Sequence, residues 1–257
     1  MLKLKILGLF LVVVVYLLQI WIYSAKQPST ASGNGRGDDG VFYGRMAEQI
    51  VGHQPIEGPA PFVYRIGGPW IAAQYAKALS VSIDSAFQQV NGIMLVILLS
   101  LVYWAALDFC SPLVAAIATC LYSLPYWSYT RVLFFCPVMG SDVPFMITMM
   151  LGLRQLVWWH ASPPRKAQIC IFSLLCLLAP IMRETGMILP ILFLCSRSWI
   201  RRHLSLEVVL GDPPLKSPSW SKNVKTEVML SLLFCLLSCL GLLITRIFAI
   251  NDGQYLF

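Results

Sequence analysis

The chain has 257 residues, of which 58% are hydrophobic and only 12% carry a charged side chain. Soluble domains contain about 25% charged residues, so this composition excludes an ordinary soluble protein and indicates a membrane protein. The net charge of +7 does not indicate nucleic-acid binding, because the basic residues form no stripe with interleaved aromatic residues. They lie instead in the connections between apolar segments, which is typical of membrane orientation signals.

Seven apolar segments are candidate membrane crossings, because a crossing helix needs about 20 apolar residues. The first, Ile6–Tyr23, is longer than the apolar part of a secretory signal, which favours a retained anchor; cleavage after Ser24-Ala25 is the alternative. The sixth is too short to cross alone, so we expect a tilted or re-entrant half-helix, or the return half of a broken hairpin with the fifth. The six later segments are approximately Ala86–Leu107, Pro112–Tyr129, Pro137–Trp158, Ala167–Met182, Gly186–Cys195 and Val228–Phe248.

The distribution of Lys and Arg predicts the orientation, since cytoplasmic loops are enriched in both. The loop 196–227 holds six of them within 29 residues, whereas the long polar segment Ser24–Gln89 spreads five over 66 residues. We therefore expect the loop to be cytoplasmic and the polar segment to face outward. The sequence predicts an all-α, polytopic membrane bundle of about seven spans. It would form a single integral membrane module over residues 1–257, with the first span at 6–23, the outward loop at 24–89 and the remaining spans within 86–248.

The outward polar segment is predicted to contain two short amphipathic helices. Asp39 stands at an expected N-cap position, ahead of apolar residues at helical spacing, and Gly52 can end that helix. Pro69 fits the first turn of a second helix, from Trp70 to about Leu79. Short amphipathic helices attached to a bilayer are expected to lie along its interface.

Asp38 and Asp39 are the first candidates for chemistry. One interpretation is a solvated pair of which one carboxylate caps the helix. The other is that one carboxylate acts as general base toward an acceptor hydroxyl, with the helix N-terminus keeping it ionised. Two adjacent carboxylates also allow a divalent metal, but without a third ligand nearby the sequence predicts no metal site and no certain cofactor.

Two arginines on the predicted outer side are candidates for binding an anion. Arg65 could extend its guanidinium to lipid headgroups or bind a phosphate through two parallel hydrogen bonds. Arg183 and Glu184 interrupt an apolar stretch, where each charge costs about 2.5–3.5 kcal/mol on insertion scales. Either the two neighbours offset each other as an ion pair, or Glu184 orients Arg183 into a cavity that accepts an anionic headgroup. We favour the second interpretation.

Further charged residues mark the two ends of the predicted spans. Asp142 opens the fourth span on the outer side, and is either a helix cap together with Ser141 or part of an acidic cavity. On the opposite side, Arg154 beside Trp158-Trp159 predicts an anchor at the membrane interface with an aromatic belt.

Three motifs resemble the GT-C class of membrane glycosyltransferases, which use polyprenyl-phosphate-linked sugars, as protein O-mannosyltransferases and aminoarabinose transferases do. Asp39-Gly40-Val41-Phe42-Tyr43 is similar to the D-G-x-F-Y stretch of many bacterial members. Pro61-Phe62-Val63-Tyr64-Arg65 with Pro69 is similar to their Y-R-x-x-x-P segment, and Arg183-Glu184-Thr185 to their R/K-E-T element. One anchor, a long outward first loop with an early acid and then a multispan bundle resemble the topology of that class.

The resemblance implies inverting transfer of a sugar from a polyprenyl-phosphate donor to an acceptor hydroxyl at the outer membrane face. It assigns the catalytic carboxylate to Asp39, with Asp38 as the competing candidate, and the contacts to the lipid phosphate to Arg65 and Arg183. The acceptor would be a glycan, a lipid or a protein, and the implied location is the bacterial cytoplasmic (inner) membrane with the active face outward. The other residues expected to bind substrate are Tyr43, Tyr64, Asp142 and Glu184.

Members of the GT-C class are usually longer, with more spans and often a soluble C-terminal domain. The sequence is therefore expected to be a minimal module, a truncated product or one partner of a split system. Two alternatives to an enzyme stay open. One is a non-catalytic protein that binds lipid-linked glycans, such as a flippase or transporter subunit; the other is an assembly or scaffold protein with a transferase-like shell.

Overall fold

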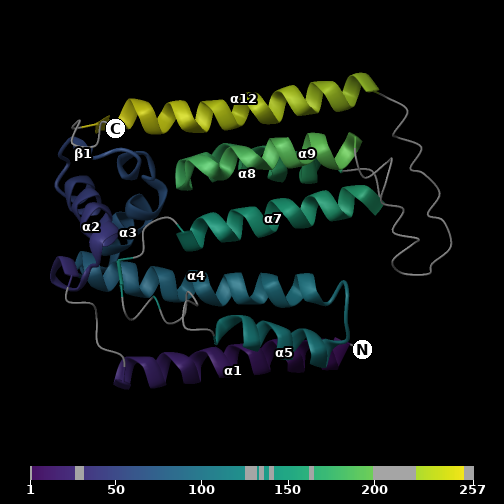
Figure 1. The fold of residues 1–257 in the computed structure, drawn as a ribbon, viewed down its shortest axis with the longest axis horizontal. Helices are drawn as coiled ribbons and strands as arrows, with labels where there is room; N and C mark the ends of the chain where they lie inside the picture. The colour runs from purple at the N-terminus through teal and green to yellow at the C-terminus, as the bar shows by residue number, and fades with distance from the viewer. Residues whose placement is uncertain are drawn as a thin grey trace.

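The computed structural model describes residues 2–26, 32–124, 132, 136–138, 142–161, 165–198 and 224–251. Within these ranges the chain is an all-α protein, and this prediction is confirmed. Seven of its described helices lie side by side and follow one another in alternating directions (Figure 1). They are α1 (Leu2–Lys26), α4 (Ile83–Ala106), α5 (Pro112–Ser123), α7 (Asp142–Ala161), α8 (Lys166–Met182), α9 (Ile188–Ser198) and α12 (Val224–Phe248).

Each predicted apolar segment coincides with one of these helices, although their ends differ. Helix α7 begins at Asp142 rather than at the predicted Pro137. Residues 136–138 are not helical, and the Pro137 carbonyl accepts a hydrogen bond from the Asn91 side chain at 3.5 Å. Asp142 and Pro144 then occupy the first turn of α7, where an acidic side chain and a proline are tolerated best. The predicted end of the third segment, at Tyr129, lies outside the described residues.

Within the described ranges, three helices are long and apolar enough to cross a membrane: Leu2–Tyr23, Ile83–Ala106 and Met229–Phe248. Shorter apolar helices cover Pro112–Ser123, Lys166–Met182 and Glu184–Cys195. Large apolar side chains are exposed along these helices, as expected for a surface that faces lipid rather than water. Examples are Phe10, Trp21, Leu113 and Leu236. Length, composition and exposed apolar surface together indicate a membrane protein.

Two buried clusters hold neighbouring helices together along the bundle. One joins α1, α4, α5 and α7, and includes Val12, Tyr16, Leu95, Leu98 and Tyr103. The other joins α7, α8, α9 and α12 through four aromatic rings whose centroids lie 4.8–6.2 Å apart: Trp159, Phe172, Phe193 and Phe234. Such aromatic pairs each contribute about 0.5–1.5 kcal/mol beyond their buried area.

The predicted aromatic belt at Trp158-Trp159 is wrong for Trp159, whose side chain is only 1% exposed and lies inside this aromatic cluster. Trp158 does lie at the surface, and the Arg154 guanidinium carbon is 5.0 Å from its ring centroid. Arg154 also approaches Asp108, with 3.6 Å between Nη2 and Oδ1. Adjacent residues on a helix point about 100° apart, so one of two neighbouring tryptophans faces the core when the other faces outward.

The polar segment folds at one end of the bundle, which we call the α2 end (Figure 1). It contains the 3₁₀ turn η1 (Ser32–Gly35), α2 (Asp38–Val51), strand β1 (Ile56–Gly58), the 3₁₀ turn η2 (Phe62–Tyr64) and α3 (Gly67–Leu79). Helices therefore stand at both positions that the sequence predicts. Strand β1 pairs in parallel with β2 (Ala249–Asn251), which directly follows α12. This pairing ties the polar segment to the end of the last helix.

The start of α2 differs from the prediction that Asp39 is its N-cap. The helix begins at Asp38, and its N-cap is Gly37, whose φ of 75° lies in the left-handed region that glycine adopts without strain. Gly52 is the C-cap, as predicted. Asp39 therefore lies within the first turn, where the unpaired N–H groups of the helix still favour a negative charge.

The apolar faces of α2 and α3 pack against protein. Both helices contribute to a buried cluster together with η2 and the first turns of α4: Tyr43, Met46, Ala47, Val63, Tyr64, Ala72, Ala73 and Phe87. Trp70 and Leu79 on α3 stay exposed. That the two helices lie along a membrane surface remains a prediction, with these exposed side chains as its candidates for lipid contact.

Candidate functional site

Six of the predicted site residues converge at the α2 end of the bundle, although they come from four distant parts of the sequence. Tyr43 lies on α2, Tyr64 and Arg65 lie at the end of η2, and Asp142 begins α7. Arg183 and Glu184 lie in the turn between α8 and the 3₁₀ segment η3 (Glu184–Met187). Because consecutive helices run in alternating directions, the helix ends that carry these residues meet at the same end of the bundle (Figure 1).

Arg65 connects three of these elements. Its Nε donates a hydrogen bond to Glu184 Oε2 at 3.2 Å, and its Nη1 donates to the Tyr43 hydroxyl at 3.3 Å. The guanidinium carbon is also 5.5 Å from the centroid of the Phe62 ring. The side chain is 15% exposed, so this arginine is held in one position by charge, hydrogen bonds and an aromatic ring. It does not extend freely toward lipid headgroups.

Arg183 and Glu184 do not act on one another as the sequence suggested. Arg183 Nη1 pairs with Asp142 Oδ1, whereas Glu184 pairs with Arg65. The backbone conformation explains why the two neighbours have different partners. Arg183 is extended (φ −158°, ψ 137°) between two helical segments. Successive side chains on an extended backbone point to opposite sides. The prediction that Glu184 orients Arg183 is therefore wrong, and each residue connects α8 to a different part of the fold.

The turn that carries these two charges is closely packed. A Cβ atom at Gly186 would collide with the backbone of Ala179 and Pro180, so only glycine fits there without a shift of the turn. Glu184 Oε1 is buried and has no hydrogen-bond partner within the described part of the chain. A buried carboxylate oxygen without a donor is costly, and it offers an acceptor to a hydroxyl group of a bound molecule.

Asp142 begins α7 and pairs with Arg183. The ion pair joins Asp142 to the charged residues of the α2 end; the cap with Ser141, which lies outside the described residues, and the acidic cavity both stay predictions. The carboxylate therefore has two roles in the fold. It lies in the first turn of α7, where a negative charge is favoured, and it connects α7 to the end of α8.

Asp39 lies one helical turn before Tyr43 on α2, so the two residues are neighbours on the same helix face. Asp39 is exposed, whereas Tyr43 beneath it is only 5% exposed. Burial raises the pKa of the Tyr43 hydroxyl; the hydrogen bond from Arg65 opposes this rise, and the charges of Asp142 and Asp39 add to it. Both carboxylates thus lie close enough to act electrostatically on one phenol. The side chain of Asp38 lies outside what the structure describes.

Two arginines of this end were not among the predicted site residues. The guanidinium carbon of Arg246, in the last turn of α12, lies 3.3 Å from the centroid of the Tyr64 ring. This residue carries the same signal as Arg183, a basic side chain at the outer end of an apolar segment.

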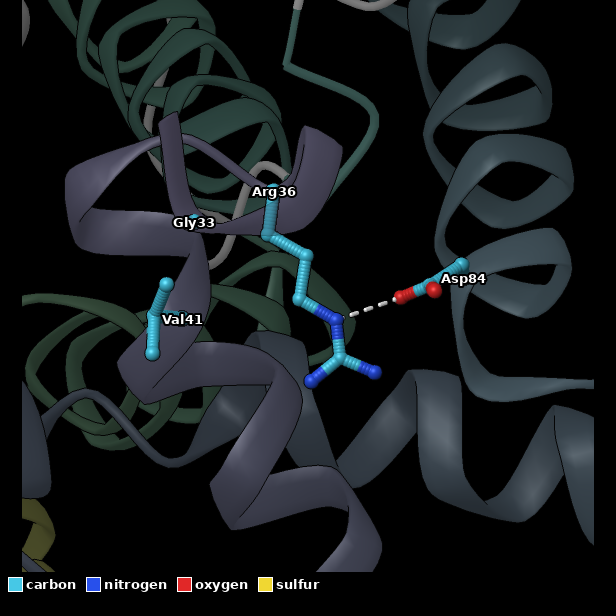
Figure 2. Close-up of a pocket in the computed structure, with 4 residues that line it drawn as sticks. All are labelled: Gly33, Arg36, Val41 and Asp84. Carbon is cyan, nitrogen blue, oxygen red and sulfur yellow. Dashed lines mark hydrogen bonds and ion pairs between the residues drawn. The ribbon is translucent and has the colours of Figure 1, made fainter. Parts of the chain in front are cut away.

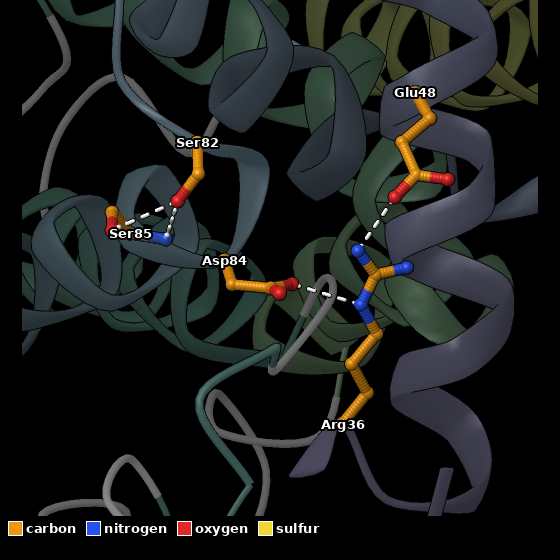
Figure 3. Close-up of polar contacts among 5 residues, drawn as sticks. All are labelled: Arg36, Glu48, Ser82, Asp84 and Ser85. Atoms are coloured by element: carbon orange, nitrogen blue, oxygen red, sulfur yellow. Dashed lines mark hydrogen bonds and ion pairs between the residues drawn. The ribbon is translucent and has the colours of Figure 1, made fainter. Parts of the chain in front are cut away.

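The other is Arg36, which joins η1 and α2 to the first turn of α4. Its Nη2 donates to Glu48 Oε1 at 2.5 Å and its Nε donates to Asp84 Oδ1 at 2.8 Å (Figure 3). Together with Gly33, Val41 and Asp84 it lines a cavity of about 420 Å³ (Figure 2). Both partners are remote in sequence, so no local pattern could have identified this contact.

Two of the carboxylates at the α2 end, Asp142 and Glu184, are each engaged by an arginine. Within the described part of the chain, no group of three or more His, Cys, Asp or Glu side chains lies close enough together to hold a metal ion.

Comparisons of the chain with protein-family models, with curated proteins and with solved structures find no match.

The arrangement combines parts that can bind and activate a polar substrate. It has an exposed carboxylate at a helix N-terminus, a buried phenol beneath it and a carboxylate oxygen with no donor among the described residues. It also has three arginines within a small region, of which two are ion-paired. Carboxylates of this kind can accept a proton from a hydroxyl group, and arginines can bind phosphate.

Proposed function

We propose that this protein is a membrane glycosyltransferase of the GT-C type. It would transfer a sugar from a polyprenyl-phosphate donor to an acceptor hydroxyl. The observation that carries this proposal is the pair of hydrogen bonds by which Arg65 joins Tyr43 to Glu184, with Asp39 one helical turn before Tyr43 on α2. These contacts join the three motifs that resemble the GT-C class, although 119 residues separate Arg65 from Glu184.

The proposal includes a membrane topology. All seven apolar helices would span or enter the bilayer, with α8, η3 and α9 forming one broken hairpin within it. The α2 end would face outward from a bacterial cytoplasmic membrane, with α2 and α3 at its surface. The loop 196–227 connects α9 and α12 at their ends opposite the α2 end and holds six Lys and Arg within 29 residues, a density that supports this orientation because cytoplasmic loops are enriched in both.

In the proposed reaction, the Asp39 carboxylate accepts the proton of the acceptor hydroxyl as its oxygen attacks the anomeric carbon of the donor sugar. The bond from that carbon to the phosphate oxygen breaks, its electron pair leaves with the lipid phosphate, and the anomeric configuration inverts. Positive charge near the leaving phosphate would lower the barrier by stabilising the developing negative charge. The free Glu184 Oε1 would accept a hydrogen bond from a sugar hydroxyl and orient the donor.

A substitution at Asp39 tests the catalytic role. Asp39→Asn keeps the size of the side chain but cannot accept the proton, so sugar transfer should fall at least about 100-fold, the lower range for general base catalysis. Binding of the donor should change little. The measurement is transfer of radiolabel from polyprenyl-phosphate sugars by purified protein, with Asp38→Asn as the matched control. Wild-type rates for Asp39→Asn combined with a large loss for Asp38→Asn would move the role to Asp38.

A second candidate function is non-catalytic binding of lipid-linked glycans, as in a flippase or transporter subunit. One observation favours it: Arg65 and Arg183 are both neutralised by carboxylates, so their pairs can serve to hold the helix ends together. Such a protein would bind the lipid-linked donor and leave its glycosidic bond intact. It would also tolerate the loss of Asp38 and Asp39 together, which an Asp39-dependent transferase cannot.

A further inference from the structure

Arg246 differs from Arg65 and Arg183 in its partners. Arg65 is paired with Glu184, and Arg183 is paired with Asp142. Within the described residues, Arg246 has no carboxylate partner, and the contact that positions it is the face of the Tyr64 ring. Each of the first two pairs is neutral overall, so of these three arginines Arg246 is the one whose charge no carboxylate of the described residues neutralises.

The position of Arg246 is fixed by backbone contacts. Strand β2 begins three residues after it and pairs with β1, with Ala249 opposite Ile56 and Asn251 opposite Gly58. Strand β1 leads directly into η2, which carries Tyr64. The paired strands therefore hold the end of α12 against η2, which keeps the backbone of Arg246 close to the Tyr64 ring.

The stacked arrangement leaves the hydrogen-bond donors of Arg246 available. A guanidinium group is planar and its five N–H groups point outward in that plane. The face of the Tyr64 ring, 3.3 Å from the guanidinium carbon to the ring centroid, attracts the cation without accepting a conventional hydrogen bond from these groups. Tyr64 itself is only 9% exposed, so the ring is a firm support, and Arg246 is exposed. Bidentate binding of a phosphate is the interaction that this geometry suits best.

We propose that Arg246, supported by Tyr64, binds the phosphate group of a membrane lipid at the α2 end of α12. The phosphate site follows from the geometry alone. Its assignment to the phosphate of the sugar donor rests on the proposed function. In that case Arg246, rather than Arg65 or Arg183, makes the direct contact with the leaving phosphate, while the two paired arginines hold the surrounding helix ends in place.

A binding experiment on the purified full chain tests this site. The protein is placed in phosphatidylcholine nanodiscs, and its affinity is measured for polyprenyl phosphate, for phosphatidylglycerol and for inorganic phosphate. Arg246→Gln removes the charge and should weaken lipid binding about 10-fold or more, the usual effect of losing charge-assisted hydrogen bonds. Arg45→Gln is the matched control, because Arg45 is an exposed arginine on the same end, in α2, and should change affinity less than about 2-fold.

Three further variants keep the test decisive if Arg246→Gln folds poorly. Arg246→Lys retains the charge but not the planar pair of donors, and should bind with intermediate affinity. Tyr64→Leu leaves Arg246 in place but removes its aromatic support, and should also weaken binding, whereas Tyr64→Phe should not.

The outcomes separate the sources of the phosphate. A loss confined to polyprenyl phosphate supports a donor site, and a loss for both lipids supports a general phospholipid site. Unchanged affinity of Arg246→Gln for both lipids, or a loss for inorganic phosphate alone, would overturn the inference. Dependence of lipid binding on Arg246 in a protein that transfers no sugar would leave this site standing and refute the proposed function alone.

Discussion

At the scale of single residues, the α2 end is organised by charged pairs that link distant segments. Arg65 and Glu184 are both largely buried, with side chains 15% and 25% exposed. Burying a charge is costly unless it has a partner, so each member of the pair depends on the other. Tyr43 strengthens the link, because its hydroxyl accepts a second hydrogen bond from Arg65.

The dependence of these two residues on one another can be measured by a double-mutant cycle. Arg65→Gln should lower the free energy of unfolding by about 1–3 kcal/mol, because it leaves Glu184 buried without its cation. Glu184→Gln should have a similar effect, and the double variant should lose less than the sum, by about 1–2 kcal/mol. Unfolding in a series of SDS concentrations would give these values. Strict additivity would mean that the pair contributes no coupling.

At the scale of the elements, the apolar runs alone predicted where the helices lie. Long apolar segments can form little else inside a membrane, since every backbone group must find a partner within its own segment. The helix ends were less predictable. Gly37 rather than Asp39 caps α2, and α7 begins at Asp142, because ends depend on local backbone conformation as much as on residue type.

The partners of the charged residues could not be predicted at this scale. The local signal singled out Arg65, Asp142, Arg183 and Glu184, and the structure brings these four residues together at the α2 end. The pairing of Arg183 with Asp142, 41 residues away, instead of with adjacent Glu184 depends on the extended backbone between α8 and η3. Only the tertiary arrangement determines which ends of antiparallel helices meet.

The turn between α8 and η3 provides a test of the element that carries both charges. Gly186→Ala should destabilise the protein by about 1–3 kcal/mol, because the new Cβ collides with the Ala179 backbone and forces the turn open. It should also reduce lipid-phosphate release by displacing Glu184. Gly52→Ala is the control, since a Cβ there meets ordinary contacts at a φ of −79° and should be neutral or slightly stabilising. Equal melting temperatures for both variants would show that the turn is not closely packed.

At the scale of the whole molecule, the proposed topology puts the α2 end and the opposite end of the bundle on different sides of a membrane. This topology predicts the location of two exposed turns, at His53 after α2 and at Phe109 between α4 and α5. A reporter enzyme that folds only outside the cytoplasm should be active when inserted after His53 and inactive after Phe109. The measurement is reporter activity in whole bacterial cells at equal expression. The reverse pattern would place the candidate site in the cytoplasm.

The activity proposed for the α2 end is cleavage of the bond between a sugar and a lipid phosphate. Incubation of the purified wild-type chain with radiolabelled polyprenyl-phosphate sugars and a mixture of membrane acceptors tests it most directly. We predict release of free polyprenyl phosphate together with label in an acceptor, and neither product with Asp39→Asn. Tight binding of the donor with every glycosidic bond intact would contradict the claim and identify the protein as a binding subunit.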